Sequence, residues 1–286
     1  MLRRYSLRNN VFPSKERLLR TLLKKLVTAN NSPWSAFPFG KKPKAPAETY
    51  LRLFNDAKGK RYLDIEKYEE KMGHAAPTKW LEELALQTQI VVKQSPLCYA
   101  HGRVLYSTLA DYLSGCDEDP VVIVDIGTAR GFSALCMAKV LEDKNTPGTV
   151  ITFDVLPHKE PMYWNCIADA NGPQTRAALL RPWAELVEKY IIFYQGDVDI
   201  FLPAFGMGRV NFAFIDGGHG YNNVIFEGEH ISQSQKTGDM IVFDDYSVDK
   251  YPGVVKAVNE LCQRCDYDGV CMQAERPRAY FIATKN

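Results

Sequence analysis

Acidic residues follow several short apolar segments of the chain, and this spacing is its strongest chemical signal. The residues are Asp125, Asp154, Asp197, Asp216 and the neighbouring pair Asp244 and Asp245. If the apolar segments are parallel strands, their carboxyl ends meet at one edge of a sheet, where the ligands of open α/β sheets bind. One such aspartate is commonly a helix cap, but five segments with the same ending predict a ligand site at that edge.

The first of these segments continues into a turn with two glycines. Val121 to Ile126 is mostly apolar, Gly127 and Gly131 follow, and apolar residues then recur at helical spacing. This pattern predicts a buried strand, a glycine turn and a helix whose N-terminus can approach a ligand. The spacing is G-x-x-x-G, so the fingerprint that cradles a pyrophosphate is absent. Asp125 suits a ligand with a cationic or hydroxyl-bearing end, and the alternative is an ordinary turn without a ligand.

The remaining aspartates divide into two groups. Asp154 and Asp197 follow the next two predicted strands, where they can meet the ribose hydroxyls and the adenine amine of a nucleoside. Asp216, Asp244 and Asp245 belong to the two strands after those, on the other side of the glycine turn. Neighbouring carboxylates repel one another unless a cation lies between them, and oxygen ligands suit Mg²⁺ or another hard divalent cation. The alternative is that Asp244 or Asp245 caps the segment that follows it.

A histidine lies close to this second group. His219 comes three residues after Asp216, in the sequence Asp-Gly-Gly-His, and the glycines leave the imidazole at the mouth of the predicted cleft. With an ordinary pKa of ~6.5, an imidazole can act as a general base for a hydroxyl. A fourth metal ligand and a structural hydrogen bond remain the alternatives.

Alternating strands and helices predict an α/β fold from residue 121 onward. We expect a Rossmann-like sheet of seven mostly parallel strands with helices on both faces, preceded by a helical N-terminal extension. The predicted strands are 121–127, 149–154, 191–197, 210–216, 239–245, a segment near Val270, and 279–283. Helices are predicted at 78–94 and 103–114, from 132 to about 143, and from 253 to about 262. The expected domains are a basic helix with its linker (1–47), a helical extension or lid (48–115) and a ligand-binding domain (116–286).

Composition favours a soluble, cytoplasmic protein. Of the 286 residues 46% are hydrophobic and 24% charged, and no apolar run reaches the ~20 residues that span a bilayer. Seven scattered cysteines form no disulfide framework, which favours a reducing compartment. Cys262 and Cys265 form a C-x-x-C pair without a second pair or a nearby histidine, so we interpret them as structural cysteines.

Basic residues are concentrated in the first part of the chain. Residues 1–60 carry 14 Lys and Arg against 3 Asp and Glu, whereas residues 61–286 carry 21 and 31. A basic amphipathic helix is predicted from Ser14 to about Ala29. We interpret it as a docking or dimer helix in a homo-oligomer, with peripheral membrane contact as the alternative. The basic residues 1–10 before it are also compatible with an organelle transit peptide. No nucleic-acid partner is expected, because no aromatic or groove-reading motif accompanies the charge.

The glycine turn, Asp125-Ile-Gly-Thr-Ala-Arg-Gly-Phe-Ser133, resembles the first motif of class I S-adenosylmethionine-dependent methyltransferases. Asp154 and the pair Gly196-Asp197 match the positions that this family uses for the ribose and the adenine of the cofactor. The resemblance covers roughly residues 95–286 and implies that the 116–286 domain binds S-adenosylmethionine. The implied cofactor-binding residues are Asp125, Gly127, Thr128, Gly131, Ser133, Asp154, Gly196 and Asp197.

A second stretch resembles the metal-dependent O-methyltransferases, most of all the group that methylates sugar hydroxyls in macrolide and aminocoumarin biosynthesis. It is Phe214-Ile-Asp-Gly-Gly-His219, followed by Val242-Phe-Asp-Asp245. The resemblance implies Mg²⁺ on Asp216, Asp244 and Asp245, and a catalytic role for His219 and Asp216. In related catechol enzymes a lysine stands in place of His219. Because the donor methyl is already activated, such an enzyme mainly positions and deprotonates a small-molecule hydroxyl, here that of a sugar or another polyol.

Several alternatives to a sugar O-methyltransferase remain. A catechol-like phenol would use the same metal geometry. A nucleotide-sugar or NAD-dependent enzyme is disfavoured by the missing G-x-G-x-x-G motif, and an inactive cofactor-binding module by the intact acidic residues. For the insert at 156–165 there are two interpretations. Either His158, Tyr163 and Trp164 line the binding site of the acceptor, or the insert is a surface loop that packs its tryptophan onto a helix. Arg176 and Arg181 could recognise a substrate anion, or they form a solvated helix face.

Overall fold

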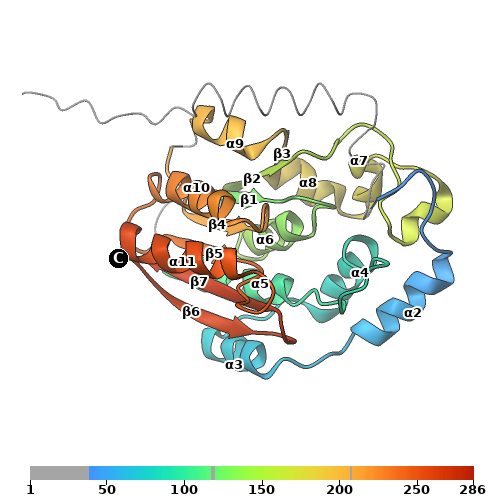
Figure 1. Cartoon of the computed structure of the whole chain (residues 1–286). Helices are drawn as coiled ribbons and strands as arrows, with labels where there is room; N and C mark the ends of the chain where they lie inside the picture. Colours follow the sequence, from blue (N-terminus) through green and yellow to red (C-terminus); the bar gives the residue numbers. More distant parts are fainter. Residues whose placement is uncertain (1–38, 117–119, 207) are drawn as a thin grey trace, which may run out of the picture.

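The computed structural model of the protein describes residues 39–116, 120–206 and 208–286. In this part of the chain, seven strands form one sheet in the order β3-β2-β1-β4-β5-β7-β6 (Figure 1). The strands are β1 (Val121–Ile126), β2 (Gly148–Asp154), β3 (Ile191–Gln195), β4 (Phe212–Ile215), β5 (Met240–Phe243), β6 (Tyr267–Gln273) and β7 (Ala279–Lys285). The predicted fold class is confirmed. The helix predicted from Ser14 to about Ala29 lies outside the described residues.

Strand pairing creates a crevice beside β1. Strands β1 to β5 are parallel to one another, whereas β7 is antiparallel to both β5 and β6. From β1 the chain adds β2 and β3 on one side, and then crosses back to add β4 and β5 on the other. Open α/β sheets bind ligands where the strand order reverses in this way, at the carboxyl ends of the strands.

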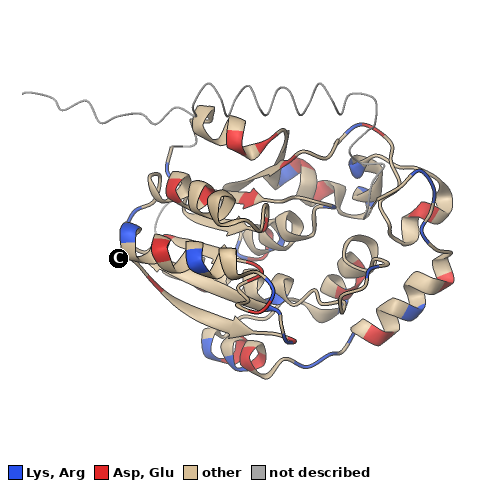
Figure 2. Cartoon of the chain, viewed as in Figure 1, with Lys and Arg blue, Asp and Glu red and all other residues tan. Residues whose placement is uncertain are grey.

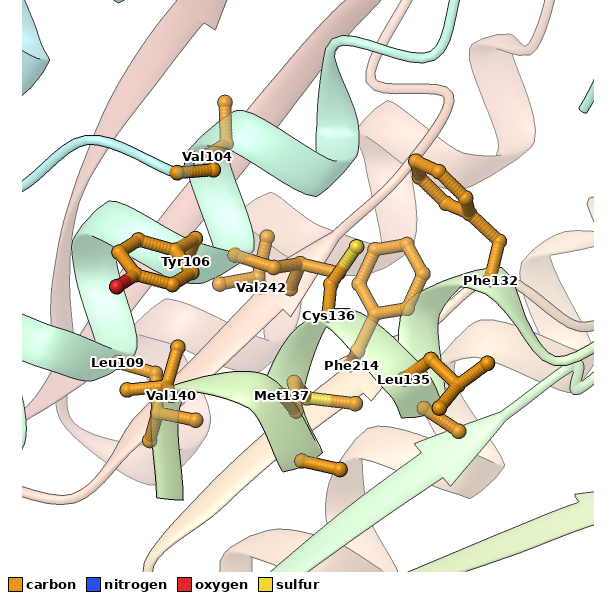
Figure 3. Close-up of a cluster of buried hydrophobic side chains, with 14 of the residues drawn as sticks. Val104, Tyr106, Leu109, Phe132, Leu135, Cys136, Met137, Val140, Phe214 and Val242 are labelled. Carbon is orange, nitrogen blue, oxygen red and sulfur yellow. The ribbon is translucent and has the colours of Figure 1, made fainter. Parts of the chain in front are cut away.

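Helices cover both faces of the sheet, and alternate residues of each strand face opposite layers. Val121 and Ile123 of β1 belong to the cluster that includes α5 (His101–Ser114) and α6 (Phe132–Asp143). Figure 3 shows side chains of these two helices meeting Phe214 and Val242 from the sheet. Val124 and Ile126 face the other cluster, beneath α10 (Tyr221–Ser232) and α11 (Pro252–Cys265). The remaining α-helices between β1 and β4 are α7 (Arg176–Leu179), α8 (Ala184–Tyr190) and α9 (Val198–Phe201).

The expected helical extension precedes β1. It consists of α2 (Ala47–Ala57), α3 (Leu63–Met72), α4 (Thr78–Thr88) and α5, and α3 packs against both α5 and β6. One boundary prediction is wrong, because the helix expected at 78–94 ends at Thr88. The residues that follow begin Ile90-Val91-Val92, whose β-branched side chains restrict helix formation, and Ile90 is buried without a helix.

A single side chain joins this non-helical segment to the insert after β2. The Asn165 amide donates to the Val92 carbonyl (3.0 Å) and accepts from the Val92 N–H (3.1 Å). The Tyr50 hydroxyl of α2 donates to the same Asn165 oxygen (3.1 Å). Asn165 itself has a positive φ of 52°, which asparagine tolerates better than most residues. Asn165 therefore adds hydrogen bonds to a contact in which α2 and α4 also pack against the 3-10 helix Ile167–Asn171 of the insert.

Charged residues of the described chain lie mainly on helices and loops, and the strands are largely uncharged (Figure 2). All seven cysteines are free thiols, including Cys262 and Cys265 in the last turn of α11. Within the described ranges, no helix combines the length and the apolar character needed to cross a bilayer.

Candidate active site

A cleft of about 340 Å³ opens at the carboxyl ends of β1 to β4. Its volume is within the usual range for a small-ligand site. Five of the residues predicted for the site line it, namely Gly127, Asp154, Gly196, Asp197 and Asp216. The structure therefore brings together side chains that are up to 89 positions apart in the sequence, because four strands end at the same edge.

The glycine turn closes the cleft at its centre. Gly127 has a φ of 102°, and a Cβ atom built on it would lie 2.1 Å from the Asp216 carbonyl oxygen. Its N–H donates to the Phe153 carbonyl (3.0 Å), while the Asp216 N–H donates to the Ile126 carbonyl (2.8 Å). Glycine is required here both for the positive φ and for the close approach of the two backbones.

Asp154 is fixed at the wall of the cleft by two backbone groups. One carboxylate oxygen accepts from the Ala129 N–H (2.6 Å) and the other from the Leu156 N–H (2.8 Å). Each oxygen keeps a further lone pair that can accept from a ligand hydroxyl. Asp197 has a second task, because its Oδ1 accepts from the Asp199 N–H (3.1 Å) and caps α9. The helix-cap alternative therefore applies to Asp197 in addition to its place in the cleft.

The four other predicted cofactor residues lie within the glycine turn or behind it. Asp125 is completely buried in β1 and accepts from the Thr152 hydroxyl (2.6 Å); burial raises its pKa to about 6. Thr128 pairs with Thr152, and Ser133 is buried in the first turn of α6. Gly131 begins that helix with a φ of 95°. None of the four lines the cleft, so their assignment as cofactor-binding residues stays a prediction.

A compact group of potential metal ligands adjoins the cleft. One ligand atom each from Asp216, His219 and Asp245 lies within 4.8 Å of the others. The His219 Nε2 is 3.5 Å from the Asp245 Oδ2, and the imidazole packs on the Tyr251 ring at 4.6 Å. Asp245 has a φ of 55°, an uncommon backbone conformation for aspartate that accompanies its place in this group.

Asp244, predicted as the third carboxylate ligand, has a different partner. Its Oδ2 accepts from the Arg278 guanidinium, and its Oδ1 accepts from the Asp245 N–H (2.6 Å). The Asp244 side chain is fully buried and that of Arg278 is 22% exposed. Arg278 was missed in the sequence because it lies directly before β7, and nothing in the sequence sets the antiparallel register of β7 against β5.

Electrostatics distinguish the three carboxyl groups. Burial, reinforced by Asp244, raises the pKa values of Asp216 and Asp245. Burial also acts to raise the pKa of Asp244, but the Arg278 guanidinium and its hydrogen bond leave that pKa lowered. The carboxyl groups of Asp216 and Asp245 thus lie beside the His219 imidazole. Because their pKa values are raised, a nearby positive charge would favour their ionised forms. A hard divalent cation fits the carboxylate oxygens of this group.

The insert after β2 does not expose its large side chains to the cleft. Trp164 is completely buried against Phe39 and its indole N–H donates to the Gln174 carbonyl (2.7 Å), so the packing alternative holds for it. His158 stacks on Phe193. Arg176 is neither solvated nor available to a substrate, which corrects both predictions: it is 1% exposed and donates to the Ala129 carbonyl (2.9 Å) within the glycine turn.

Comparison with known protein families decides the general activity. Residues 124–246 match the sequence profile of a methyltransferase domain, a segment that begins inside β1 and ends just after Asp245. Residues 124–246 therefore form a methyltransferase domain. The sheet order and the antiparallel β7 are those of the class I fold, which confirms the family resemblance of the glycine turn.

Solved structures share the fold of this methyltransferase domain and of the helices before it. The O-methyltransferase NovP is 14% identical, with a TM-score of 0.52 over 84% of this chain and 100% of its own. Cofactor-bound Rv0187 from MTB is 15% identical, with a TM-score of 0.50 over 86% and 100%. At this identity the likeness concerns the fold alone. A search among curated proteins finds no match.

Proposed function

We propose that this methyltransferase domain transfers a methyl group from S-adenosylmethionine to a hydroxyl of a small molecule, and that it uses a hard divalent cation such as Mg²⁺. A sugar or glycoconjugate is the acceptor class favoured by the sequence resemblance. One observation carries the proposal: Asp216 belongs both to the cleft and to the group formed with His219 and Asp245. A methyl donor in the cleft and an acceptor hydroxyl at the group would therefore be neighbours.

The cleft suits the nucleoside part of the cofactor. Asp154 presents both of its oxygens from a fixed position, which matches two adjacent ribose hydroxyls. The Gly127 turn lets a ligand approach the backbone closely. When bound, S-adenosylmethionine supplies a methyl group that its sulfonium has already activated, so the protein has only to hold the donor in line with the acceptor oxygen.

Asp216 and Asp245 are the residues that would hold the cation. When bound, it would lower the pKa of the acceptor hydroxyl. Asp244, predicted as a third ligand, is engaged by Arg278 and orients Asp245 through the Asp245 N–H. We therefore propose that Asp244 contributes to the group mainly by fixing the backbone of Asp245.

His219 is proposed as the general base. Its side chain is 43% exposed, so an acceptor can reach it, and Asp245 is close enough to stabilise the imidazolium that forms. The acceptor proton moves to His219 as the oxygen forms a bond to the methyl carbon. The carbon–sulfur bond breaks with its electron pair left on sulfur, which gives a methyl ether and S-adenosylhomocysteine.

Calorimetric titration of S-adenosylhomocysteine into the purified protein tests the proposed cofactor. We expect micromolar affinity, about −8 kcal/mol, in Mg²⁺ and also with a chelator, because Asp154 and Asp197, proposed for the nucleoside, are distinct from the two carboxylates proposed for the cation. Failure to bind under both conditions would exclude the methyl donor. Binding without any transfer to hydroxyl acceptors would instead indicate a cofactor-binding module.

Replacing His219 with alanine tests the base. We expect turnover to fall by about 10²–10⁴-fold while Mg²⁺ affinity stays near that of the wild type. His230→Ala is the matched control, because His230 lies at the far end of α10, bonded to the Phe226 carbonyl. A large loss of Mg²⁺ affinity in His219→Ala would make His219 a ligand. Sugar and catechol acceptors assayed side by side would separate the two acceptor classes.

The remaining expectations about partners stay predictions. Peripheral membrane contact and a docking or dimer role both depend on residues 14–29, which lie outside the described ranges. Homo-oligomer formation is a prediction of the same kind.

A further inference from the structure

A buried glutamate forms part of the cleft wall. Glu227 comes from the second turn of α10, lines the cleft, and has a relative exposure of 0%. Neither carboxyl oxygen has a hydrogen-bond partner within the part of the chain that the structure describes. Buried polar groups are almost always paired, so an unpaired carboxyl group at a ligand cleft requires an explanation.

Glu227 lies at the end of the cleft that is formed by α9 and by the backbone after Asp216. A Cβ atom built on Gly217 would lie 3.2 Å from the Glu227 Oε1, so the carboxyl group is close behind the backbone that follows Asp216. Helix α10 packs against α9, which begins directly after Asp197. Asp197 and Glu227 thus reach the cleft from two adjacent helices, at the end proposed for the adenine.

Glu227 is held in its neutral form. Burial raises its pKa to about 8, and the nearby Asp199 and Asp197 raise it further in the same direction. At neutral pH the group is therefore a carboxylic acid, which has one O–H donor and one carbonyl acceptor, whereas a carboxylate can only accept. Asp197 already uses one oxygen to accept from the Asp199 N–H.

We propose that Glu227 is a specificity-determining residue of the cofactor site, and that its neutral carboxyl group pairs with the adenine. The acid O–H donates to ring nitrogen N1, and the acid carbonyl accepts from the 6-amino group. This pairing rests on the proposed function, because it requires an adenosyl ligand in the cleft. It also accounts for a buried carboxyl group that makes no bond within the described protein.

Several other charged groups lie near α10, and a pH experiment must distinguish their titration from that of Glu227. Asp197 and Asp199 face it from α9, and Asp216 follows the end of β4. The charged residues of α11 on this side are engaged elsewhere: Glu260 accepts from the Tyr221 hydroxyl, Arg264 pairs with Glu229 and Glu260, and Lys256 lies over the Tyr221 ring. A Glu227 variant that cannot ionise isolates the contribution of this one group.

Two substitutions test the proposal by titration of S-adenosylhomocysteine in chelator. Glu227→Leu keeps the volume but removes both bonding groups, so affinity at pH 7 should fall by about 10–100-fold. The melting temperature should rise by a few degrees, because an unpaired buried carboxyl group is lost. Glu227→Gln keeps a donor and an acceptor, and its affinity at pH 7 should stay within about threefold of wild type. Glu229→Gln on the outer side of α10 is the control and should change neither quantity.

The pH dependence gives a second readout. Because only the protonated form pairs with the adenine, wild-type affinity should fall by about five- to sixfold between pH 8 and pH 9, beyond any fall in Glu227→Gln, which also reports the titration of the ligand itself. Equal pH profiles for the two proteins, or unchanged affinity in Glu227→Leu, would overturn the proposal while leaving the proposed function intact. No binding by the wild type would overturn both.

Discussion

Replacing Arg278 with methionine is expected to lower the free energy of unfolding by about 3–5 kcal/mol, because it leaves the buried Asp244 carboxylate without its counter-charge. The Asp244 side chain is fully buried, and Arg278 is the group that lowers its pKa against the effect of burial. Methionine retains most of the volume of the arginine side chain, so the loss reports charge and hydrogen bonding more than packing. Denaturant unfolding measures the difference.

Two further variants make this prediction specific. Asp244→Asn combined with Arg278→Met should recover most of the lost stability, because no unpaired charge remains in the double variant. Arg61→Met is the control, since Arg61 pairs with Glu66 at 76% exposure and should contribute little. If Arg278→Met unfolds like the wild type, Asp244 is compensated by another group and Arg278 is dispensable.

The second large effect is expected at the glycine turn. Gly127→Ala should lower the free energy of unfolding by about 3–5 kcal/mol, combining an unfavourable positive φ with overpacking. The new methyl group would meet the Asp216 carbonyl at 2.1 Å, so the end of β1 must separate from the end of β4. S-adenosylhomocysteine binding should be lost along with the stability, which calorimetry and denaturant unfolding measure on the same sample.

Gly59→Ala separates the two causes. Gly59 has a φ of 70°, but a Cβ atom there meets nothing within 4 Å. This control should therefore lose only about 1–2 kcal/mol from the backbone conformation, and ligand binding should be unaffected. Equal losses at the two positions would show that the contact between Gly127 and Asp216 is not important for the site.

The strands and their acidic ends were predictable because both depend on short-range patterns. Each parallel strand is an apolar segment a few residues long, buried on both faces except at the edge strand β3, and the direction of the chain places its carboxyl end at the common edge. The right-handed crossover then brings Asp154 and Asp216 to one cleft without any knowledge of side-chain packing. His219 was predictable for the same reason, since it lies only three residues beyond Asp216.

The contributions of isolated charged residues were not predictable. Arg278 reaches Asp244 only through the antiparallel register of β7, and Arg176 becomes buried only because the insert folds over it. Glu227 lies on the same face of α10 as Val224 and Ile231, but a single charged residue type gives no sign that its carboxyl group is buried without a partner. Burial of such groups depends on contacts between distant segments, and the sequence of a single chain carries no local signal for those contacts.

The amide of Asn165 has a consequence for sequence variation. It bonds to the backbone N–H and C=O of Val92, which every residue except proline presents in the same way. We therefore expect position 92 to accept other residues, except proline, whose side chains fit the packing there. Position 165 has no such freedom, because it must supply a donor, an acceptor and a positive φ together. Substitutions are therefore expected to be tolerated at position 92 and to be destabilising at position 165.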